Sequence, residues 1–262
     1  MKKIVLLLML VMSVSVANAW IKHCEEAVVI LASENLTPKA KGVFDKYLGN
    51  RYGDDVQYLY ALEKAKKAKH TEEIHYLHLN KKFQPKAKKN DAYGEIVRAL
   101  GVVRKHESAS PAEVTAALRT IINLMCDMHT MANVRIANIP LSQDDFTFLT
   151  YTSEIGKKKF TTTKARWSKK WRNYCNYPNG FSAKYRAHDF RIYLGNRFAE
   201  FSKGTLEDWA TESGKMAAHY LDMCRPDKVV SFGDFRIMDD VNYEQMVKAS
   251  CRLAALINET VK

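Results

Sequence analysis

Apolar residues recur at helical spacing along most of the chain, most clearly between residues 110 and 129. The apolar positions there fall on one side of a helix: Val114, Leu118, Ile121, Met125 and Met128. Ser110 stands where a helix cap is expected, with Pro111 in the first turn and Glu113 completing a capping box. This stretch therefore predicts a helix that begins just after Ser110.

Three further stretches follow the same logic, at residues 36–49, 204–221 and 242–261. Thr37 and Thr205 are predicted to cap the first two of these helices. We find no convincing period-two pattern of the kind that strands show, and no internal repeat. We therefore expect an all-α protein that forms a single, mostly helical domain.

The first 19 residues have the pattern of a secretory signal peptide. Lys2 and Lys3 precede an apolar run, and the run ends in the small-residue triplet Ala17-Asn18-Ala19. The run is too short and wrongly flanked for a spanning helix, and no other long apolar run follows. We expect cleavage between Ala19 and Trp20, a domain covering residues 20–262, and a secreted or periplasmic protein without a transmembrane segment. The alternative is an uncleaved anchor.

The chain is strongly basic, with a formal net charge of +12, which favours anionic partners. Residues 157–191 contain eleven Lys or Arg residues and a single acid, Asp189, with eight aromatic residues interleaved. Such a mixture suits the phosphates and bases of a single-stranded nucleic acid. We expect the binding residues to be Lys169, Lys170, Trp167 and Trp171. The alternative is that the aromatic residues pack on the core and the lysines are merely solvated.

One acid interrupts the apolar end of the helix predicted over residues 110–129. Asp127 lies among methionines, and burying a carboxylate is costly unless something pairs with it. From the residues alone, Asp127 is either a hydrogen-bonded structural acid or one ligand of a metal inside the helical bundle.

Five stretches together resemble the S1/P1 nuclease family, the secreted zinc-dependent nucleases related to bacterial phospholipase C. They are residues 20–25, 69–76, 122–133, 204–213 and 249–258, which read WIKHCE, KHTEEIHY, INLMCDMHTMAN, GTLEDWATES and ASCRLAALIN. The first is similar to W-G-x-x-G-H, the third to H-x-x-x-D-x-H-Q-P-L-H, and the fourth to G-T-P-E-D-W-A-x-E-S. The resemblance spans nearly the whole chain after residue 19 and implies a phospholipase C/P1 nuclease-like fold.

The resemblance also implies a metal centre. In this family three zinc ions, held by the N-terminal tryptophan, histidines and aspartates, activate water for phosphodiester hydrolysis. Matching positions leave four ligands here: Trp20, Glu25, His75 and Asp127. Other ligand positions are replaced, by Asn123, Asn133, Ser168 and Arg172. One zinc ion is therefore the most that the ligand set predicts. Asp127 would hold that ion or anchor the amine of Trp20, and His129 falls on a position that is not a ligand.

These features leave three hypotheses for function. The first is a secreted, nuclease-like protein with a degenerate zinc site that binds an anionic ligand such as single-stranded nucleic acid. The second is an active metal-dependent phosphodiesterase, endonuclease or nucleotidase with a one-metal centre, in which Asp127 and Arg172 are catalytic and the Arg172 guanidinium stabilises phosphate charge. The third is a secreted interaction module without an anionic ligand.

Overall fold

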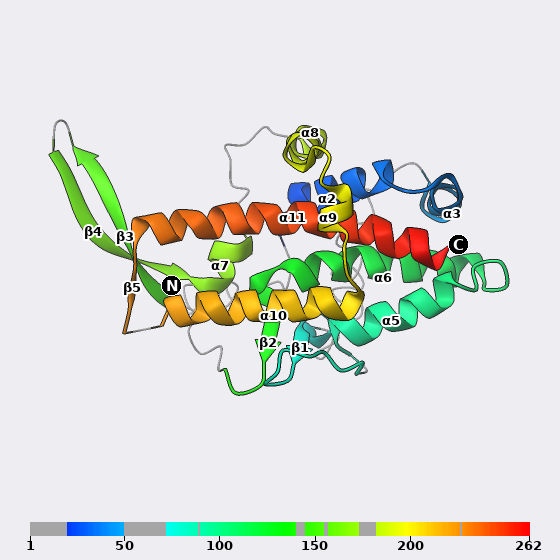
Figure 1. Ribbon diagram of the computed structural model, residues 1–262, viewed down its shortest axis with the longest axis horizontal. Coiled ribbons are helices and arrows are strands. Elements are labelled where there is room, and N and C mark those ends of the chain that lie inside the picture. Colours follow the sequence, from blue (N-terminus) through cyan, green and yellow to red (C-terminus); the bar gives the residue numbers. More distant parts are fainter. Residues whose placement is uncertain are drawn as a thin grey trace, which may run out of the picture.

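The computed structural model describes residues 20–49, 72–88, 90–139, 145–154, 157–172, 182–225 and 227–262. These residues form a mostly helical fold with two small sheets (Figure 1). The longer helices are α2 (Lys22–Glu34), α3 (Pro38–Leu48), α5 (Ala92–Val103), α6 (Pro111–His129), α8 (Ala183–Leu194), α10 (Leu206–Met223) and α11 (Phe232–Thr260). The shorter helical pieces are η2 (Glu72–His75), η3 (Met131–Asn133), α7 (Trp167–Arg172) and α9 (Phe198–Phe201).

The predicted caps of α3, α6 and α10 are confirmed. The hydroxyl of Thr37 accepts from the backbone N–H of Ala40, and Pro38 occupies the first turn of α3. Ser110 and Thr205 each form a reciprocal capping box at the start of α6 and α10. The last helix, α11, begins ten residues earlier than residue 242, because Ser231 caps it by accepting from the N–H of Asp234.

The expectation that the chain contains no strands is wrong. Strands β3 (Asp145–Glu154) and β4 (Lys157–Arg166) form an antiparallel hairpin that extends beyond the helices (Figure 1), and β5 (Val229–Val230) adds to β3 in parallel. Strands β1 (Leu77–Leu79) and β2 (Val134–Ile136) form a second, parallel pair. In β3, the alternation of apolar and polar residues is clear only over Phe146, Thr147 and Phe148, which is too short to predict a strand.

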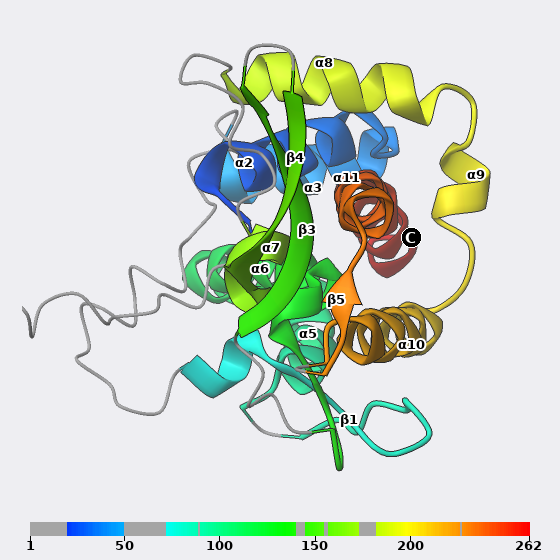
Figure 2. The ribbon, with the colours of Figure 1, turned by 90° about the vertical axis from the view of Figure 1, so that its left-hand side faces the viewer.

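The core is divided between two clusters of buried apolar side chains. The larger surrounds α6, which lies between α5, α10 and α11, and the smaller joins α2, α8 and the middle of α11 around Trp20. In Figure 2, α8 and α2 form one side of the molecule and α10 and α5 the opposite side. Within the described part of the chain, no helix is both long and apolar enough to cross a membrane.

The five cysteines do not all pair. Cys24 is disulfide-bonded. Cys126, Cys224 and Cys251 are free thiols, and all three are buried. An odd number of cysteines leaves at least one thiol that cannot pair within the chain.

Candidate functional site: a buried carboxylate cluster and a basic hairpin

Asp127 is the centre of a buried polar cluster near the C-terminal end of α6. Its side chain is almost fully buried, and each carboxylate oxygen has a partner from a neighbouring 3-10 helix. Asn133 of η3 donates to Oδ1 over 2.6 Å, and Nδ1 of His75 in η2 lies 2.6 Å from Oδ2. These contacts supply the pairing that a carboxylate inside an apolar helix requires.

Arg172 extends the cluster toward the surface. Its Nη2 donates to Oδ1 of Asn133 over 2.7 Å, so that a continuous chain runs from Arg172 through Asn133 and Asp127 to His75. Burial raises the pKa of the Asp127 carboxyl above its ordinary value. The positive field of His75, the field of Arg172 and the hydrogen bond from Asn133 oppose that rise.

Trp20 and Glu25 form a second buried pair. The backbone nitrogen of Trp20 donates to Oε1 of Glu25 over 3.0 Å, and the indole Nε1 donates to Oδ1 of Asn242 over 2.9 Å. Asn242 in turn donates to the carbonyl of Trp171 over 2.8 Å. In this structure Glu25, five residues along the chain, accepts from the backbone nitrogen of Trp20. That Asp127 anchors the free amine left by cleavage stays a prediction.

The four expected metal ligands form two hydrogen-bonded pairs. Trp20 pairs with Glu25, and His75 pairs with Asp127. Zinc sites take three or four donors around one ion. Over the described ranges, no group of three or more His, Cys, Asp or Glu residues could hold a metal ion. Asn123, at another replaced position, donates to the carbonyl of Arg119 over 2.7 Å. This arrangement does not fit a zinc ion.

A second buried ionic network joins α6 to α10 and α11, and the sequence analysis missed it. His129 is fully buried, with Nδ1 2.8 Å from the carbonyl of Met125 and Nε2 3.1 Å from Nη1 of Arg252. Arg252 also pairs with Glu212, which Lys248 contacts over 2.9 Å. Burial and the nearby Arg252 lower the pKa of His129 to about 3, so the imidazole is neutral. In this network His129 links α6 to α11.

Two of the four expected nucleic-acid-binding residues are core residues. Trp167 and Trp171 are 2% and 0% exposed, and their ring centroids lie 5.4 Å apart in an edge-on contact. They cannot stack on bases in this structure, so that part of the prediction is wrong. Lys170 is also unsuited, because its ammonium pairs with Asp239 and donates to the carbonyl of Phe235 over 2.9 Å. Lys169 is exposed, as expected.

Exposed apolar and basic side chains gather instead on the β3–β4 hairpin and at its base. Seven large apolar side chains are exposed in the described part of the chain. Four of these belong to β4, β5 or the first turns of α11, namely Phe160, Val229, Phe232 and Ile237. Phe160 is 67% exposed, and Lys164 and Arg166 on the same strand are also exposed.

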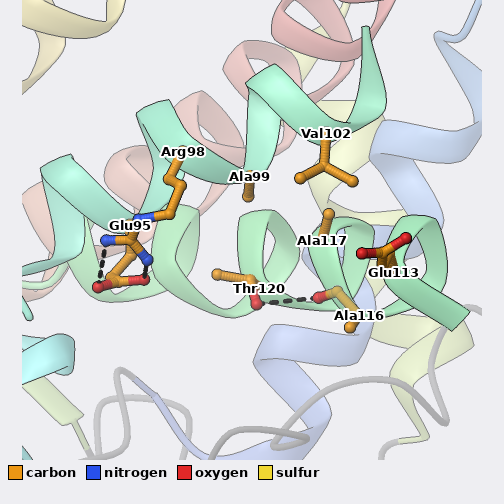
Figure 3. A pocket seen from close by; sticks show the side chains of 8 residues that line it. All are labelled: Glu95, Arg98, Ala99, Val102, Glu113, Ala116, Ala117 and Thr120. Carbon is orange, nitrogen blue, oxygen red and sulfur yellow. Dashed lines mark hydrogen bonds and ion pairs between the residues drawn. The ribbon is translucent and has the colours of Figure 1, made fainter. Parts of the chain in front are cut away.

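A shallow groove of about 240 Å³ lies between α5 and α6 (Figure 3). Its lining on α6 ends at Thr120, which precedes Asp127 along the helix. Its floor consists mainly of small apolar side chains, including Ala99, Ala116 and Ala117. Its polar groups already have partners: Glu95 pairs with Arg98, and the other polar residues bond within α6 or its cap. The groove therefore offers no catalytic group.

No protein-family model matches this chain, and no curated protein sequence matches it either.

Proposed function

We propose that this chain is a secreted relative of the S1/P1 nucleases, with a phospholipase C/P1 nuclease-like fold and a degenerate zinc site, which binds single-stranded nucleic acid or a similar anionic ligand. The observation that carries the proposal is the pairing of Asp127 within the protein. Both of its carboxylate oxygens bond to side chains of the same protein, His75 and Asn133, over 2.6 Å each.

The positive charge of Arg172 supports the proposal that the Asp127 cluster holds no metal ion. Its guanidinium binds Asn133, the side chain that also donates to Asp127. A cation at that point disfavours a metal ion nearby through like-charge repulsion. At the same time, guanidinium and imidazole groups near the carboxylate offset the cost of burying it. The cluster is thus interpreted as a structural replacement for a metal centre.

The charge of the whole chain supports an anionic ligand. The protein has 41 Lys or Arg residues against 29 Asp or Glu residues, and this excess of positive charge attracts polyanions. Binding through phosphate contacts weakens steeply as salt rises. A secreted interaction module without an anionic ligand would lack that dependence.

The test combines binding and cleavage on the same sample. The protein without residues 1–19 is titrated into fluorescein-labelled oligothymidine, once with excess EDTA and once with added zinc, and the strand is then run on a denaturing gel. The proposal expects equal, salt-sensitive binding in both conditions and an intact strand. Zinc-dependent cleavage that Asp127→Asn abolishes would instead favour the one-metal phosphodiesterase.

A further inference from the structure

The β3–β4 hairpin has two faces that differ in their surroundings. Directly paired residues share a face, so Phe146 and Phe148 lie on the same face as their partners Ala165 and Thr163. This inner face is fixed to the body: Phe146 is 2% exposed, and Phe148 stacks on Phe235 of α11 with ring centroids 4.1 Å apart. The base of the hairpin is therefore held rigidly to the helices.

The outer face points away from the helices. Its positions on β4 are Phe160, Thr162, Lys164 and Arg166, and all four are exposed. Thr147 of β3 stands between Lys164 on one side and Val229 of β5, which is 52% exposed, on the other. Lys164, Thr147 and Val229 thus lie side by side across β4, β3 and β5, and they extend the exposed face of the β3–β4 hairpin, called the arm below, to its base. Figure 2 shows β3 and β4 running across the front of the molecule.

The charge of the hairpin matches a polyanion. Residues 145–166 contain five basic and two acidic residues, which is a net charge of +3. Lys164 and Arg166 project from the outer face two residues apart, a separation of about 6.6 Å along a strand. Phe160 lies further along the same face and offers an uncovered aromatic ring.

We propose that this outer face is the surface that binds single-stranded nucleic acid, with Phe160 stacking on a base and Lys164 and Arg166 contacting phosphates. The inference rests on the proposed function and names its site. A basic strand face with an exposed aromatic ring is the combination that binds single strands without sequence preference. Thr147 and Thr162 add hydroxyl donors beside the basic groups.

Two other partners fit the face less well. A membrane-binding surface needs a continuous apolar side, and Thr147 and Thr162 interrupt this one. Strand β4 is the edge of its sheet, so another chain could add to it as a further strand. Lysines on an edge strand oppose such pairing, and β4 carries four of them.

The test uses two variants of the arm and two matched controls on another surface. Phe160→Ala is compared with Ile192→Ala, since Ile192 on α8 is 69% exposed. Lys164→Gln is compared with Lys184→Gln, also an exposed lysine on α8. Each protein is titrated into labelled oligothymidine at several salt concentrations. Circular dichroism and thermal unfolding confirm that every variant is folded.

The arm variants should change binding in different ways. Loss of base stacking in Phe160→Ala should weaken the affinity by roughly 5-fold to 100-fold. Lys164→Gln should make the slope of log K against log salt shallower by about 0.7, the value for one phosphate contact on a single strand. Both α8 controls should bind like the unchanged protein.

Failure of this inference is distinguishable from failure of the proposed function. If the unchanged protein binds and both arm variants bind equally well, the arm inference is overturned while the proposed function stands. If the unchanged protein does not bind at low salt, both fall. Should Phe160→Ala lose binding to phosphatidylglycerol vesicles but keep its affinity for oligothymidine, the arm is a membrane-binding element and the inference is also overturned.

Discussion

The Asp127 cluster and the β3–β4 arm are both polar regions, but their surroundings are opposite. Asp127, His75 and Asn133 are buried, and each is bonded to another member of the cluster. On the arm, Phe160 and Lys164 are turned to solvent. The comparison indicates a stabilising role for the cluster, and our proposal assigns binding to the hairpin. Substitutions in the two regions should therefore separate the free energy of unfolding from the affinity for nucleic acid.

The largest effect on stability is expected for Asp127→Ala. Removing one partner of a buried ionic network leaves the others unpaired, which costs about 3–5 kcal/mol in the free energy of unfolding. Urea denaturation measures the change. The control is Asp45→Ala on α3, which removes a half-exposed pair with Lys41 and should cost less than about 1 kcal/mol. Equal losses of unfolding free energy in Asp127→Ala and Asp45→Ala would contradict the expectation that the buried charge matters more for stability than the exposed one.

The buried His129 should make stability depend on pH. Its pKa is lowered from 6.5 to about 3 in the folded protein, so the unfolded chain takes up the proton first as the pH falls. The contribution of the neutral His129 to the free energy of unfolding is complete above pH 6.5 and is lost as the pH falls toward 3. The loss amounts to about 2 kcal/mol between pH 7 and pH 5. Glu212, whose pKa is lowered from 4.5 to about 2 by Arg252 and Lys248 against the opposing effect of burial, acts mainly below pH 5, outside the interval from pH 7 to pH 5.

Urea denaturation at pH 7 and pH 5 measures that dependence. His129→Gln, which removes the titrating group, should flatten the difference between the two pH values. His23→Gln is the control, since the His23 side chain is 62% exposed. An unchanged pH dependence in His129→Gln would mean that the pKa of this imidazole is the same in the folded and unfolded states.

A smaller effect is expected from the helix caps that the sequence predicts. Ser110→Ala removes the side-chain acceptor of the capping box at the start of α6, which costs about 1 kcal/mol. Thr205→Ala should cost a similar amount at the start of α10. Ser108→Ala, just before the helix, is the control for urea denaturation. If Ser110→Ala is no less stable than Ser108→Ala, the cap contributes nothing measurable.

The smallest effect on stability is expected on the outer face of the arm. Phe160→Ala should change the free energy of unfolding by less than about 0.5 kcal/mol, because the ring is largely exposed. Phe146→Ala, on the inner face of the same hairpin, should cost about 3 kcal/mol through the cavity it leaves. Thermal or urea unfolding of the two variants compares the faces directly. A large loss in Phe160→Ala would place that ring in the core.

The sequence predicted the helices where local signals act alone. Caps and proline positions at Thr37, Ser110 and Thr205 are short-range features, so the starts of α3, α6 and α10 follow from them. The hairpin was missed because a clear alternation covers only Phe146, Thr147 and Phe148, which is too short to predict a strand. Strand pairing depends on contacts that a local pattern does not contain.

The candidate site was only partly predictable for a related reason. The burial of Asp127 followed from the methionines around it, but its pairing with His75 spans 52 positions of the chain. The misassigned tryptophans did carry a usable signal: Trp167 and Trp171 stand four residues apart, on one face of a helix, which is the spacing of a packed face. Phe160 lacks such a partner within its strand and remains exposed.

The central claim is that this protein binds single strands without cutting them. The most direct measurement is the fluorescence anisotropy of labelled oligothymidine in excess EDTA as salt rises, followed by a denaturing gel of the same sample after zinc is restored. The account predicts saturable binding and a strand of unchanged length. The logarithm of the association constant should fall linearly with the logarithm of the salt concentration. A strand shortened only when zinc is present would contradict it.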